Sequence, residues 1–320
     1  MKRKKLKFVI IFCVILISVI AFCIYRDRIN YIKSIEGMKV TMLGGSTMKD
    51  KGDMVSCGYI IRSRNGQLII VDGGQRVDYE LVLDYIHKYG NGTVNHWYIT
   101  HPHGDHIGAL LEILNNKNDV VIENLYYSFN DLEWYRENDK RGFEFEEQMI
   151  KSLSNKKIKN KVLCKKNQTI EMDNINCEII RIANPEITNS DNGNDSSMVF
   201  KMTATDVDKS IIFLGDAFYY ASQELLKNPE KLKANAVQMA HHGQNGVTKE
   251  VYEAISPEIC FFSTPEWLYN NDNGGGYNSG KWKTVEVRSW VEELGAKTYK
   301  AFEGDQTIRF TSEGFEKIEE

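Results

Sequence analysis

The feature that most constrains this 320-residue chain is a run of metal-binding side chains, Thr100-His101-Pro102-His103-Gly104-Asp105-His106, directly after an apolar segment. Three imidazoles and one carboxylate within six residues can point into a single cavity if the run forms a tight turn, which Gly104 permits. Imidazole and carboxylate ligands suit Zn²⁺, Mn²⁺ or Fe²⁺. Together with His96, four of the seven histidines lie within eleven residues, which a plain surface loop would not require. The run therefore predicts a metal site at the end of a strand.

From residue 38 onward the chain alternates strand patterns with amphipathic helix patterns and contains no long linker. In the helix predicted over 78–89, for example, Tyr79, Val82, Leu83 and Ile86 follow the i, i+3, i+4, i+7 spacing of a helix face. We expect one α/β (α+β) domain over residues 38–320. Strands are predicted at 39–43, 58–62, 67–71, 94–100, 197–205, 210–214, 236–240, 297–302 and 307–310, and helices at 78–89, 107–114, 218–227 and 284–293.

The N-terminus predicts a single-pass membrane anchor. Residues 8–25 carry no charge, and Ser18 is their only plainly polar residue. As a helix they would span about 27 Å, close to the ~30 Å hydrocarbon core of a bilayer. We therefore expect a basic segment and transmembrane helix within 1–25 and a linker over 26–37. Five cations precede the span, which places the body outside the cytoplasm by the positive-inside rule. Cleavage as a signal peptide, or lipidation at Cys23, is the alternative.

The body of the chain is acidic. The whole chain carries −4, and because five cations lie before residue 8, residues 8–320 carry −9. An acidic body lacks the basic surface that general nucleic-acid binding needs, so nucleic acid is not the favoured partner. The six cysteines contain no C-x-x-C pair and are expected to be buried thiols. A Cys164–Cys177 bridge across a hairpin is the open alternative.

The run T-H-P-H-G-D-H-I-G resembles the H-x-H-x-D-H signature of the metallo-β-lactamase superfamily. The flanking order is similar as well, with Asp72-Gly73-Gly74 upstream and Phe213-Leu214-Gly215-Asp216 and His241-His242-Gly243 downstream. Residues 194–199, 214–216 and 241–243 look most like the ComEC-type branch, named for the competence protein of DNA uptake. The resemblance covers residues 38–310 and implies an αββα sandwich with a dinuclear site at one edge.

The resemblance also implies which residues hold two divalent ions, zinc first, with manganese or iron as alternatives. The expected ligands are His101 and His103 for the first metal, Asp105 and His106 for the second, and Asp216 as a bridge between them. The last ligand of the second metal would come from His241 or His242. Because consecutive strand residues point to opposite faces, only one of these two should reach the ion. The other could contact substrate or donate a proton to the leaving group.

One departure from the family pattern concerns the first metal. Many members of the superfamily supply another histidine from the segment that here reads Gly193-Asn194-Asp195-Ser196, and no histidine lies between His106 and His241. Asp195, or less favourably Asn194, would have to replace it. An oxygen ligand at that place would favour harder ions than zinc. Asp72, after a buried strand, is expected either to orient a ligand histidine or simply to end the strand.

The expected chemistry is hydrolysis. Two metals about 3.5–4 Å apart can generate hydroxide near neutral pH and neutralise charge on the attacked centre. We expect a membrane-anchored, metal-dependent hydrolase, with phosphodiesters as the preferred substrates because the ComEC-like motifs resemble branches that act on phosphate esters. The alternatives are a lactone or β-lactam hydrolase and a metal-bearing, non-catalytic partner in DNA uptake.

A glycine-rich segment points to a cell-envelope substrate. Residues 270–280 contain five Asn or Asp residues and four Gly residues, a composition that predicts a mobile loop. Four aromatic residues flank or belong to it: Trp267, Tyr269, Tyr277 and Trp282. A quaternary ammonium such as choline could stack on these rings. Ordinary packing of the four rings is the alternative.

Overall fold

The computed structural model describes residues 18–28, 35–44, 54–140, 142–188 and 192–319. The chain divides into residues 1–36 and a body of residues 37–320. Residues 18–28 are helical. Within the described ranges no helix combines the length and the apolar character needed to cross a bilayer. The anchor predicted over 8–25 extends into residues outside those ranges and stays a prediction.

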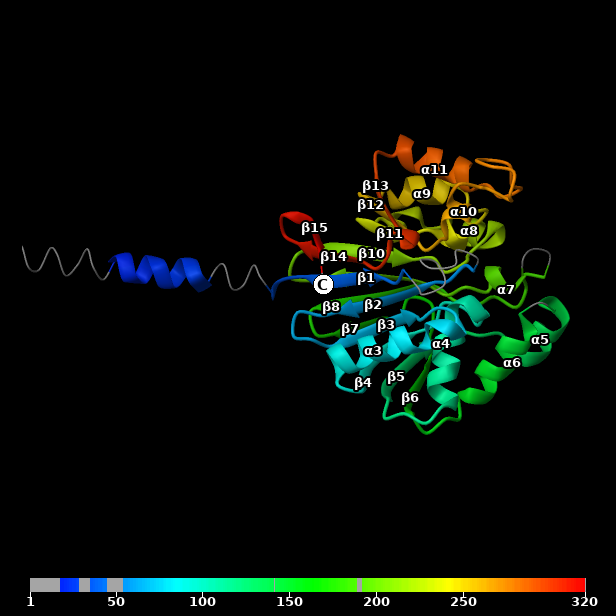
Figure 1. Ribbon diagram of the computed structural model, residues 1–320, viewed down its shortest axis with the longest axis horizontal. Helices are drawn as coiled ribbons and strands as arrows, with labels where there is room; N and C mark the ends of the chain where they lie inside the picture. Colours follow the sequence, from blue (N-terminus) through cyan, green and yellow to red (C-terminus); the bar gives the residue numbers. More distant parts are fainter. Residues whose placement is uncertain (1–17, 29–34, 45–53, 141, 189–191, 320) are drawn as a thin grey trace, which may run out of the picture. The chain divides into compact units, whose positions relative to one another are not determined.

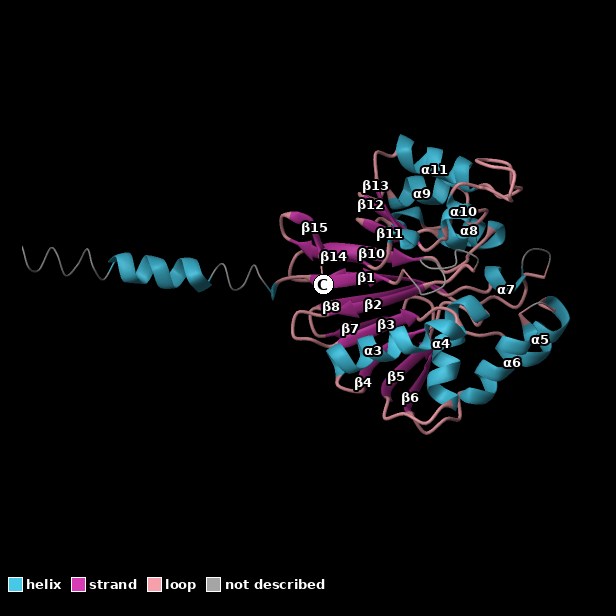
Figure 2. Cartoon of the chain, in the orientation of Figure 1, coloured by secondary structure: helices cyan, strands magenta, loops and turns pink. Residues whose placement is uncertain are grey.

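The body consists of two β-sheets that pack face to face, with helices on both outer sides (Figures 1 and 2). The first sheet has eight strands in the order β15-β14-β1-β2-β3-β4-β5-β6. Their bounds are β1 (Met38–Met42), β2 (Gly58–Arg62), β3 (Leu68–Asp72), β4 (Thr93–Tyr98), β5 (Val121–Tyr127), β6 (Ile158–Leu163), β14 (Gln306–Thr311) and β15 (Gly314–Ile318). Antiparallel pairing of β1 with β14 joins the two ends of the body in one sheet.

The second sheet has seven strands in the order β13-β12-β11-β10-β9-β8-β7. Their bounds are β7 (Thr169–Met172), β8 (Ile175–Arg181), β9 (Val199–Ala204), β10 (Lys209–Phe213), β11 (Ala236–Gln238), β12 (Ile259–Phe262) and β13 (Lys297–Lys300). Strands β3 to β6 are parallel in the first sheet, and β10 to β13 are parallel in the second. Since parallel strands end at the same edge, the loops that follow them can meet there.

Helices cover the outer face of each sheet (Figure 2). Near the first sheet lie η1 (Arg76–Asp78), α3 (Tyr79–Gly90), α4 (Gly104–Asn115), α5 (Leu132–Asn138) and α6 (Phe143–Ser152). The remaining helical elements are α7 (Asn192–Asp195), α8 (Tyr219–Leu225), η2 (Pro229–Leu232), η3 (Ala240–Gly243), α9 (Lys249–Ile255), α10 (Glu266–Tyr269), α11 (Thr284–Glu293) and η4 (Ala301–Glu303).

Three apolar clusters fill the three spaces between the four layers. One fills the space between the sheets and includes Tyr59, Phe200 and Phe213. A second lies under α3 and α4, and a third lies under α8, α9 and α11. Burial of this apolar surface is the main force that holds the layers together. The architecture agrees with the αββα sandwich expected from the sequence.

Most predicted elements are present within two or three residues, but the middle of the chain contains elements that the sequence pattern did not predict. These are β5 to β8, α5 and α6. Strand β6 shows the reason: Ile158 is buried, while the lysines that follow it are largely exposed because β6 lies at the edge of its sheet. An edge strand of this kind lacks a clear apolar alternation. Cys164 and Cys177, the pair considered for a bridge, are buried free thiols.

Two boundaries differ where they affect the site. Helix α4 begins at Gly104 and not at residue 107, so Asp105 and His106 lie in its first turn. Strand β11 ends at Gln238 and not at residue 240. His241 and His242 therefore belong to the tight turn η3, in which both have left-handed backbone angles, with φ of 49° and 59°.

Candidate metal centre

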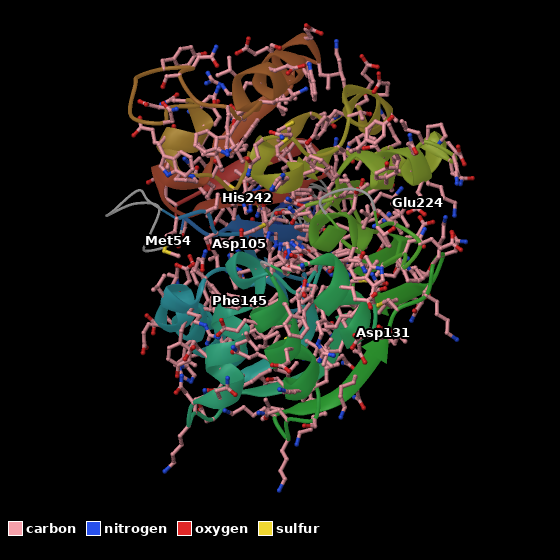
Figure 3. The ribbon with its side chains drawn as sticks, turned by 90° about the vertical axis from the view of Figure 1, so that its right-hand side faces the viewer. Met54, Asp105, Asp131, Phe145, Glu224 and His242 are labelled. Atoms are coloured by element: carbon pink, nitrogen blue, oxygen red, sulfur yellow. The ribbon has the colours of Figure 1, made fainter. Side chains whose placement is uncertain are left out.

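The predicted ligands gather at the edge where the parallel strands of the two sheets end. The histidine run follows β4, Asp216 follows β10, and His242 follows β11. Figure 3 looks toward this edge, where Asp105 from the first half of the chain and His242 from the second half lie next to each other. The shared edge of parallel strands thus brings together residues more than a hundred positions apart.

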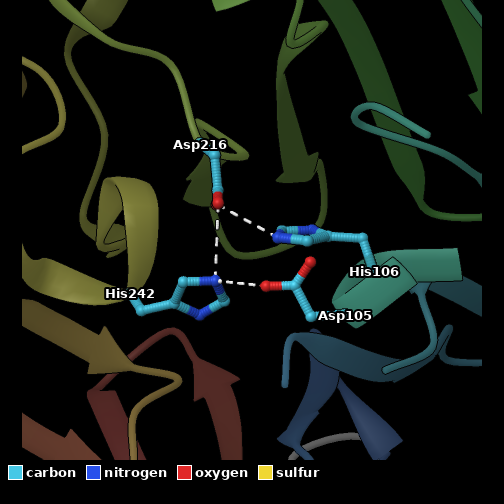
Figure 4. A group of neighbouring side chains, drawn as sticks. All are labelled: Asp105, His106, Asp216 and His242. Atoms are coloured by element: carbon cyan, nitrogen blue, oxygen red, sulfur yellow. Dashed lines mark hydrogen bonds and ion pairs between the residues drawn. The ribbon is translucent and has the colours of Figure 1, made fainter. Parts of the chain in front are cut away.

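Four of these side chains form a compact cluster (Figure 4). The ligand atoms of Asp105, His106, Asp216 and His242 all lie within 4.8 Å of one another. His242 Nε2 lies 3.1 Å from Asp105 Oδ2 and 3.4 Å from Asp216 Oδ2, and His106 Nε2 lies 3.1 Å from Asp216 Oδ1. This set suits a divalent transition-metal ion, and it contains the residues predicted for the second metal.

The imidazole of His106 is fixed from behind by Asp72. His106 Nδ1 donates to Asp72 Oδ2 at 2.7 Å, which leaves Nε2 facing Asp216. The same carboxylate accepts the backbone amide and the hydroxyl of Thr100, both at 2.8 Å. Asp72 therefore contacts a ligand histidine as the sequence predicted, in the arrangement that commonly sets the tautomer of a metal-binding histidine.

Asp216 and His242 are held by groups on the second sheet. Gln238 Oε1 accepts the backbone amides of Leu214 and Gly215, and Ser197 Oγ accepts the amide of Asp216 at 3.0 Å. His242 Nδ1 donates to the Ser263 carbonyl at 2.9 Å, so Nε2 points into the cluster. These contacts fix both ligands before any ion binds.

His242, and not His241, reaches the cluster. The prediction that only one of the pair would do so agrees with the structure, but its reason was wrong, because neither residue lies in a strand. The left-handed turn swings the two side chains apart. Such backbone angles cost on the order of 1–3 kcal/mol for residues other than glycine and are typical of functional sites.

His101 and His103 lie beside this cluster. Their ring centroids are 4.6 Å apart, and His101 Nε2 lies 4.0 Å from Asp216 Oδ2. The hydroxyl of Thr100 donates to Asp72, so it accepts from His101 Nδ1 at 3.1 Å and leaves His101 Nε2 free as a ligand. These two imidazoles are in place for the first metal.

His103 is held by a carboxylate that sequence reasoning missed. His103 Nε2 donates to Asp139 Oδ2 at 2.6 Å, so Nδ1 is the nitrogen left for a metal. Asp139 follows α5, and the backbone of Gly193 packs so closely on this pair that a Cβ there would meet Asp139 Oδ2 at 1.6 Å. No sequence signal links Asp139 to the histidine run, because it lies 36 positions away in an unpredicted helical region.

A second buried carboxyl lies behind Asp139. Glu146 on α6 is fully buried, and its carboxyl oxygens face no hydrogen-bond donor. Burial, followed by the negative charge of Asp139, raises the pKa of Glu146 to about 10. As a neutral acid, Glu146 can donate a hydrogen bond to Asp139.

Asp195, the predicted third ligand of the first metal, has another role in the structure. Its two carboxylate oxygens accept the backbone amides of Phe218, Tyr220 and Ala221 at 2.8, 3.2 and 3.0 Å. These are the unpaired amides at the start of α8, which need acceptors. The structure therefore replaces the predicted metal contact of Asp195 with a helix cap.

Several buried polar atoms converge at the predicted centre without a hydrogen-bond partner. In the described part of the chain these include His101 Nε2 and Asn194 Oδ1, while His106 Nε2 and Asp216 Oδ1 face each other at 3.1 Å without the geometry of a hydrogen bond. A buried polar atom without a partner costs about 1–3 kcal/mol, which packing alone does not explain. Nitrogen and oxygen atoms arranged in this way fit divalent cations.

The pKa values of the histidines in and beside the cluster shift in different directions. Burial, together with the neighbouring imidazoles of His106 and His103, lowers the pKa of His101 well below its usual value. Burial alone would also lower the pKa values of His106 and His242. The nearby carboxylates, Asp216 above all, instead raise both well above the usual value. In the absence of a cation, protons on His106 and His242 would balance the carboxylates.

A cavity of about 450 Å³ opens onto the centre. Its lining comprises Met54, Gln75, His103, Gly104, Asp105, Asp139, Gly142, Phe145, Asn194 and His241. Asp105 and His103 contribute polar groups to the lining, and Phe145 and Met54 contribute apolar surface. Figure 3 labels Asp105, Phe145 and Met54. His241 thus faces the cavity, which is the position expected for a residue that contacts substrate.

The aromatic residues proposed for a quaternary ammonium are not among the residues that line this cavity. The guanidinium of Arg288 lies 4.1 Å from the ring centre of Tyr269, and the rings of Trp267 and Trp282 pack edge to face. The segment 270–280, predicted to be mobile, is organised around the side chain of Asn271, which bonds Asn278, Gly280 and Trp282. The rings of Trp267, Tyr269 and Trp282 are therefore engaged in packing, whereas Tyr277 is 63% exposed.

Comparison with known proteins agrees with this geometry. Residues 50–163 match the family model of the metallo-beta-lactamase superfamily. No curated protein matches this chain in sequence.

Solved structures with a similar fold include the metallo-beta-lactamase fold protein YhfI from Bacillus subtilis. It has 14% identity and a TM-score of 0.50, and the match covers 84% of this chain and 98% of that one. Yeast PDE1 has 11% identity and a TM-score of 0.51, with coverage of 86% and 99%. CmlA, a diiron beta-hydroxylase from Streptomyces venezuelae, has 12% identity and a TM-score of 0.50, with coverage of 86% and 54%. At such identities the likeness concerns the fold. The family match adds that the segment with the histidine run, residues 50–163, is similar to the metallo-beta-lactamase superfamily.

Proposed function

We propose that this chain is a metal-dependent hydrolase that cleaves phosphodiester bonds at a two-metal centre. The observation that carries the proposal is the buried cluster of Asp105, His106, Asp216 and His242, with His101 and His103 beside it. Bound divalent ions would acidify water and neutralise charge on the attacked group. Zinc suits the imidazole-rich set, and manganese or iron would also be compatible with it.

The charge of the site favours a diester over a phosphate monoester. Two divalent ions and the carboxylates of Asp105, Asp139 and Asp216 would leave one positive charge, and the residues that line the described cavity include neither lysine nor arginine. A phosphate monoester carries about −1.5 to −2 at neutral pH, whereas a diester carries a single charge. The charge of the site therefore matches a diester better than a monoester.

The residues of the chain itself would bind and orient the substrate. His241 lies at the cavity wall, with Nδ1 fixed by the Asn245 carbonyl at 2.9 Å. Phe145 and Met54 offer apolar surface to a substituent of the ester. Asp72 and Asp139 hold His106 and His103 in the tautomers that leave one nitrogen of each for a metal.

Proteins with this fold support metal chemistry of more than one kind. Yeast PDE1, a phosphodiesterase, supports the proposed reaction class. CmlA is a diiron enzyme, which supports iron as an alternative metal. The motifs that resemble the ComEC-type branch add to the argument for phosphate esters. The proposed position of the acidic body outside the cytoplasm suggests a substrate of the cell envelope.

A direct assay tests the proposal. The full-length chain, loaded with Zn²⁺ or Mn²⁺, should hydrolyse bis-p-nitrophenyl phosphate, and Asp216→Ala should not. Nitrocefin and a lactone are the comparison substrates. Faster hydrolysis of either one would favour a carboxyl-side hydrolase. Absence of all three activities in a chain that holds two ions would favour a non-catalytic partner.

We also propose that the body lies outside the cytoplasm, tethered by residues 8–25. The support is the apolar span and the five cations before it. Protease added to intact cells should remove a C-terminal tag. If the tag is protected until the membrane is opened, the orientation is wrong.

A further inference from the structure

In the two-metal centre proposed above, the first metal still lacks a third protein ligand. His101 and His103 supply two nitrogens, and the segment that would supply a third histidine contains none. Asp195 is excluded by its contacts, because its carboxylate is shared among three backbone amides of the α8 N-terminus. The neighbouring residue, Asn194, instead lines the cavity.

Asn194 lies at the wall of the cavity with its side chain almost wholly buried. Only 5% of the residue is exposed, and its Oδ1 has no hydrogen-bond partner. Asn194 lines the same cavity as His103 and Asp105. The segment is brought there by Gly193, whose backbone packs against the His103–Asp139 pair with no space for a side chain.

The hydrogen bonds of His241 decide which way the Asn194 amide points. His241 Nδ1 donates to the Asn245 carbonyl, so Nε2 of the neutral ring can only accept. Asn194 Nδ2 lies 3.3 Å from that Nε2 and is its donor. The amide nitrogen is therefore committed to His241, and the oxygen is the atom left without a partner.

We propose that Asn194 Oδ1 is the third protein ligand of the first metal, with His241 as the residue that orients it. The first metal would then be held by His101 Nε2, His103 Nδ1 and an amide oxygen, together with the bridging Asp216. A neutral oxygen ligand binds zinc less tightly than imidazole does and is better suited to harder ions such as Mn²⁺. The first metal is accordingly the more weakly held of the two and the less selective for zinc.

Metal titration of the full-length chain tests this without any substrate. Zn²⁺ and, separately, Mn²⁺ are added in competition with a chelator, for the parent and for three variants. Asn194→Leu keeps the size of the side chain and removes the oxygen, Asn194→His restores an imidazole, and Asp195→Asn is the matched control beside it. Thermal unfolding checks that each variant is folded.

The parent should bind two ions with unequal affinities. Asn194→Leu should weaken the weaker site at least about tenfold, since loss of even an outer-shell partner commonly costs 10–100-fold in metal affinity. The tighter site and the control should not change. Asn194→His should tighten zinc at the weaker site and lower its relative preference for Mn²⁺.

Two results would overturn the inference. One is that both metal affinities stay unchanged in Asn194→Leu and in Asn194→His. The other is that the weaker site keeps its affinity in Asn194→Leu but is lost in His241→Leu, which would make His241 the ligand. If the titration gives the expected result but the phosphodiester assay fails, the assignment of Asn194 as a ligand stands and only the proposed reaction is contradicted.

Discussion

In the proposed second-metal half of the site, the side chains of Asp105, His106, Asp216 and His242 already face one another. The proposed first-metal half instead brings together the imidazoles of His101 and His103 and the amide of Asn194. Every histidine of the second half has its other nitrogen fixed by a buried acceptor. The first half depends on Asp139, from a helical region outside the two sheets.

The two halves also differ in how directly the two sheets position their ligands. The second-metal half stands on β10, β11 and the first turn of α4, which the two apolar cores hold in place. The first-metal half relies on α5, α6 and the short α7, which lie beyond the strand ends. We expect changes in the second half to affect the ion that is bound tightly and changes in the first half to affect metal selectivity.

The largest effect is expected at Asp216, which belongs to the second half and also lies 4.0 Å from His101 of the first. Asp216→Ala should lower phosphodiester turnover by more than about 10²–10³, the value of a single preorganised electrostatic contact, because both ions lose a ligand. Turnover of bis-p-nitrophenyl phosphate is the measurement, with folding checked by thermal unfolding. Full activity in this variant would rule out the two-metal mechanism.

A pair of matched variants separates the halves. Asp72→Ala removes the acceptor behind His106, and Asp139→Ala removes the acceptor behind His103. Asp139→Ala should weaken the first ion by about 10–100-fold and leave the second nearly unchanged. Asp72→Ala should weaken the second ion by a similar factor and the first ion less, because Asp72 also holds Thr100, which contacts His101. Chelator competition with Zn²⁺ reads both affinities. If both variants weaken the same ion most, the division into two halves is wrong.

The halves should also differ in the protons that they release. Because neighbouring carboxylates overcome the effect of burial and raise the pKa values of His106 and His242, both rings hold protons near pH 7 when no cation is bound. A metal must displace those protons, so loading of the second half should release about two protons and weaken as the pH falls. In the first half, His101 is already neutral, since burial lowers its pKa, while for His103 the effect of burial is outweighed by Asp139, which raises the pKa. Loading of the first half should therefore release fewer protons than loading of the second. Calorimetry in buffers of different ionisation enthalpy measures the release. Equal heats in all buffers would contradict this.

The smallest expected effect concerns the residue that the sequence placed in the first-metal half. Asp195→Ala should leave both metal affinities unchanged and lower the free energy of unfolding by about 1–3 kcal/mol, because buried amides of α8 lose their acceptor. Asp131→Ala, which removes an exposed cap of α5, is the matched control and should cost about 1 kcal/mol. A changed metal affinity in Asp195→Ala would restore its role as a ligand. Urea unfolding measures the change in the free energy of unfolding, and metal titration measures the two metal affinities.

The sequence predicted the parts of the molecule that local patterns encode. The histidine run, the strand before it and Asp216 after a buried strand each carry a short-range signal, and the parallel strand pattern brings them to one edge. Gln238 could have been noticed as a polar residue within an apolar strand. Its hydrogen bonds to Leu214 and Gly215 hold the backbone of the bridging ligand.

Other parts could not be read from spacing. Asp139 and Glu146 act through helices packed beyond an edge strand, so no periodic pattern places them near His103. Asn194 and Asp195 are adjacent, and only the three-dimensional path of the backbone decides that one faces the cavity and the other caps α8. The same holds for His241 and His242, whose left-handed turn replaces the expected strand.

The two-metal centre is tested most simply by the metal content of the full-length chain, purified without chelator and measured by elemental analysis. We expect close to two transition-metal ions per chain, with phosphodiester hydrolysis that is lost on chelation and restored by Zn²⁺ or Mn²⁺. A reproducible value of zero, with no hydrolysis restored by either ion, would contradict it.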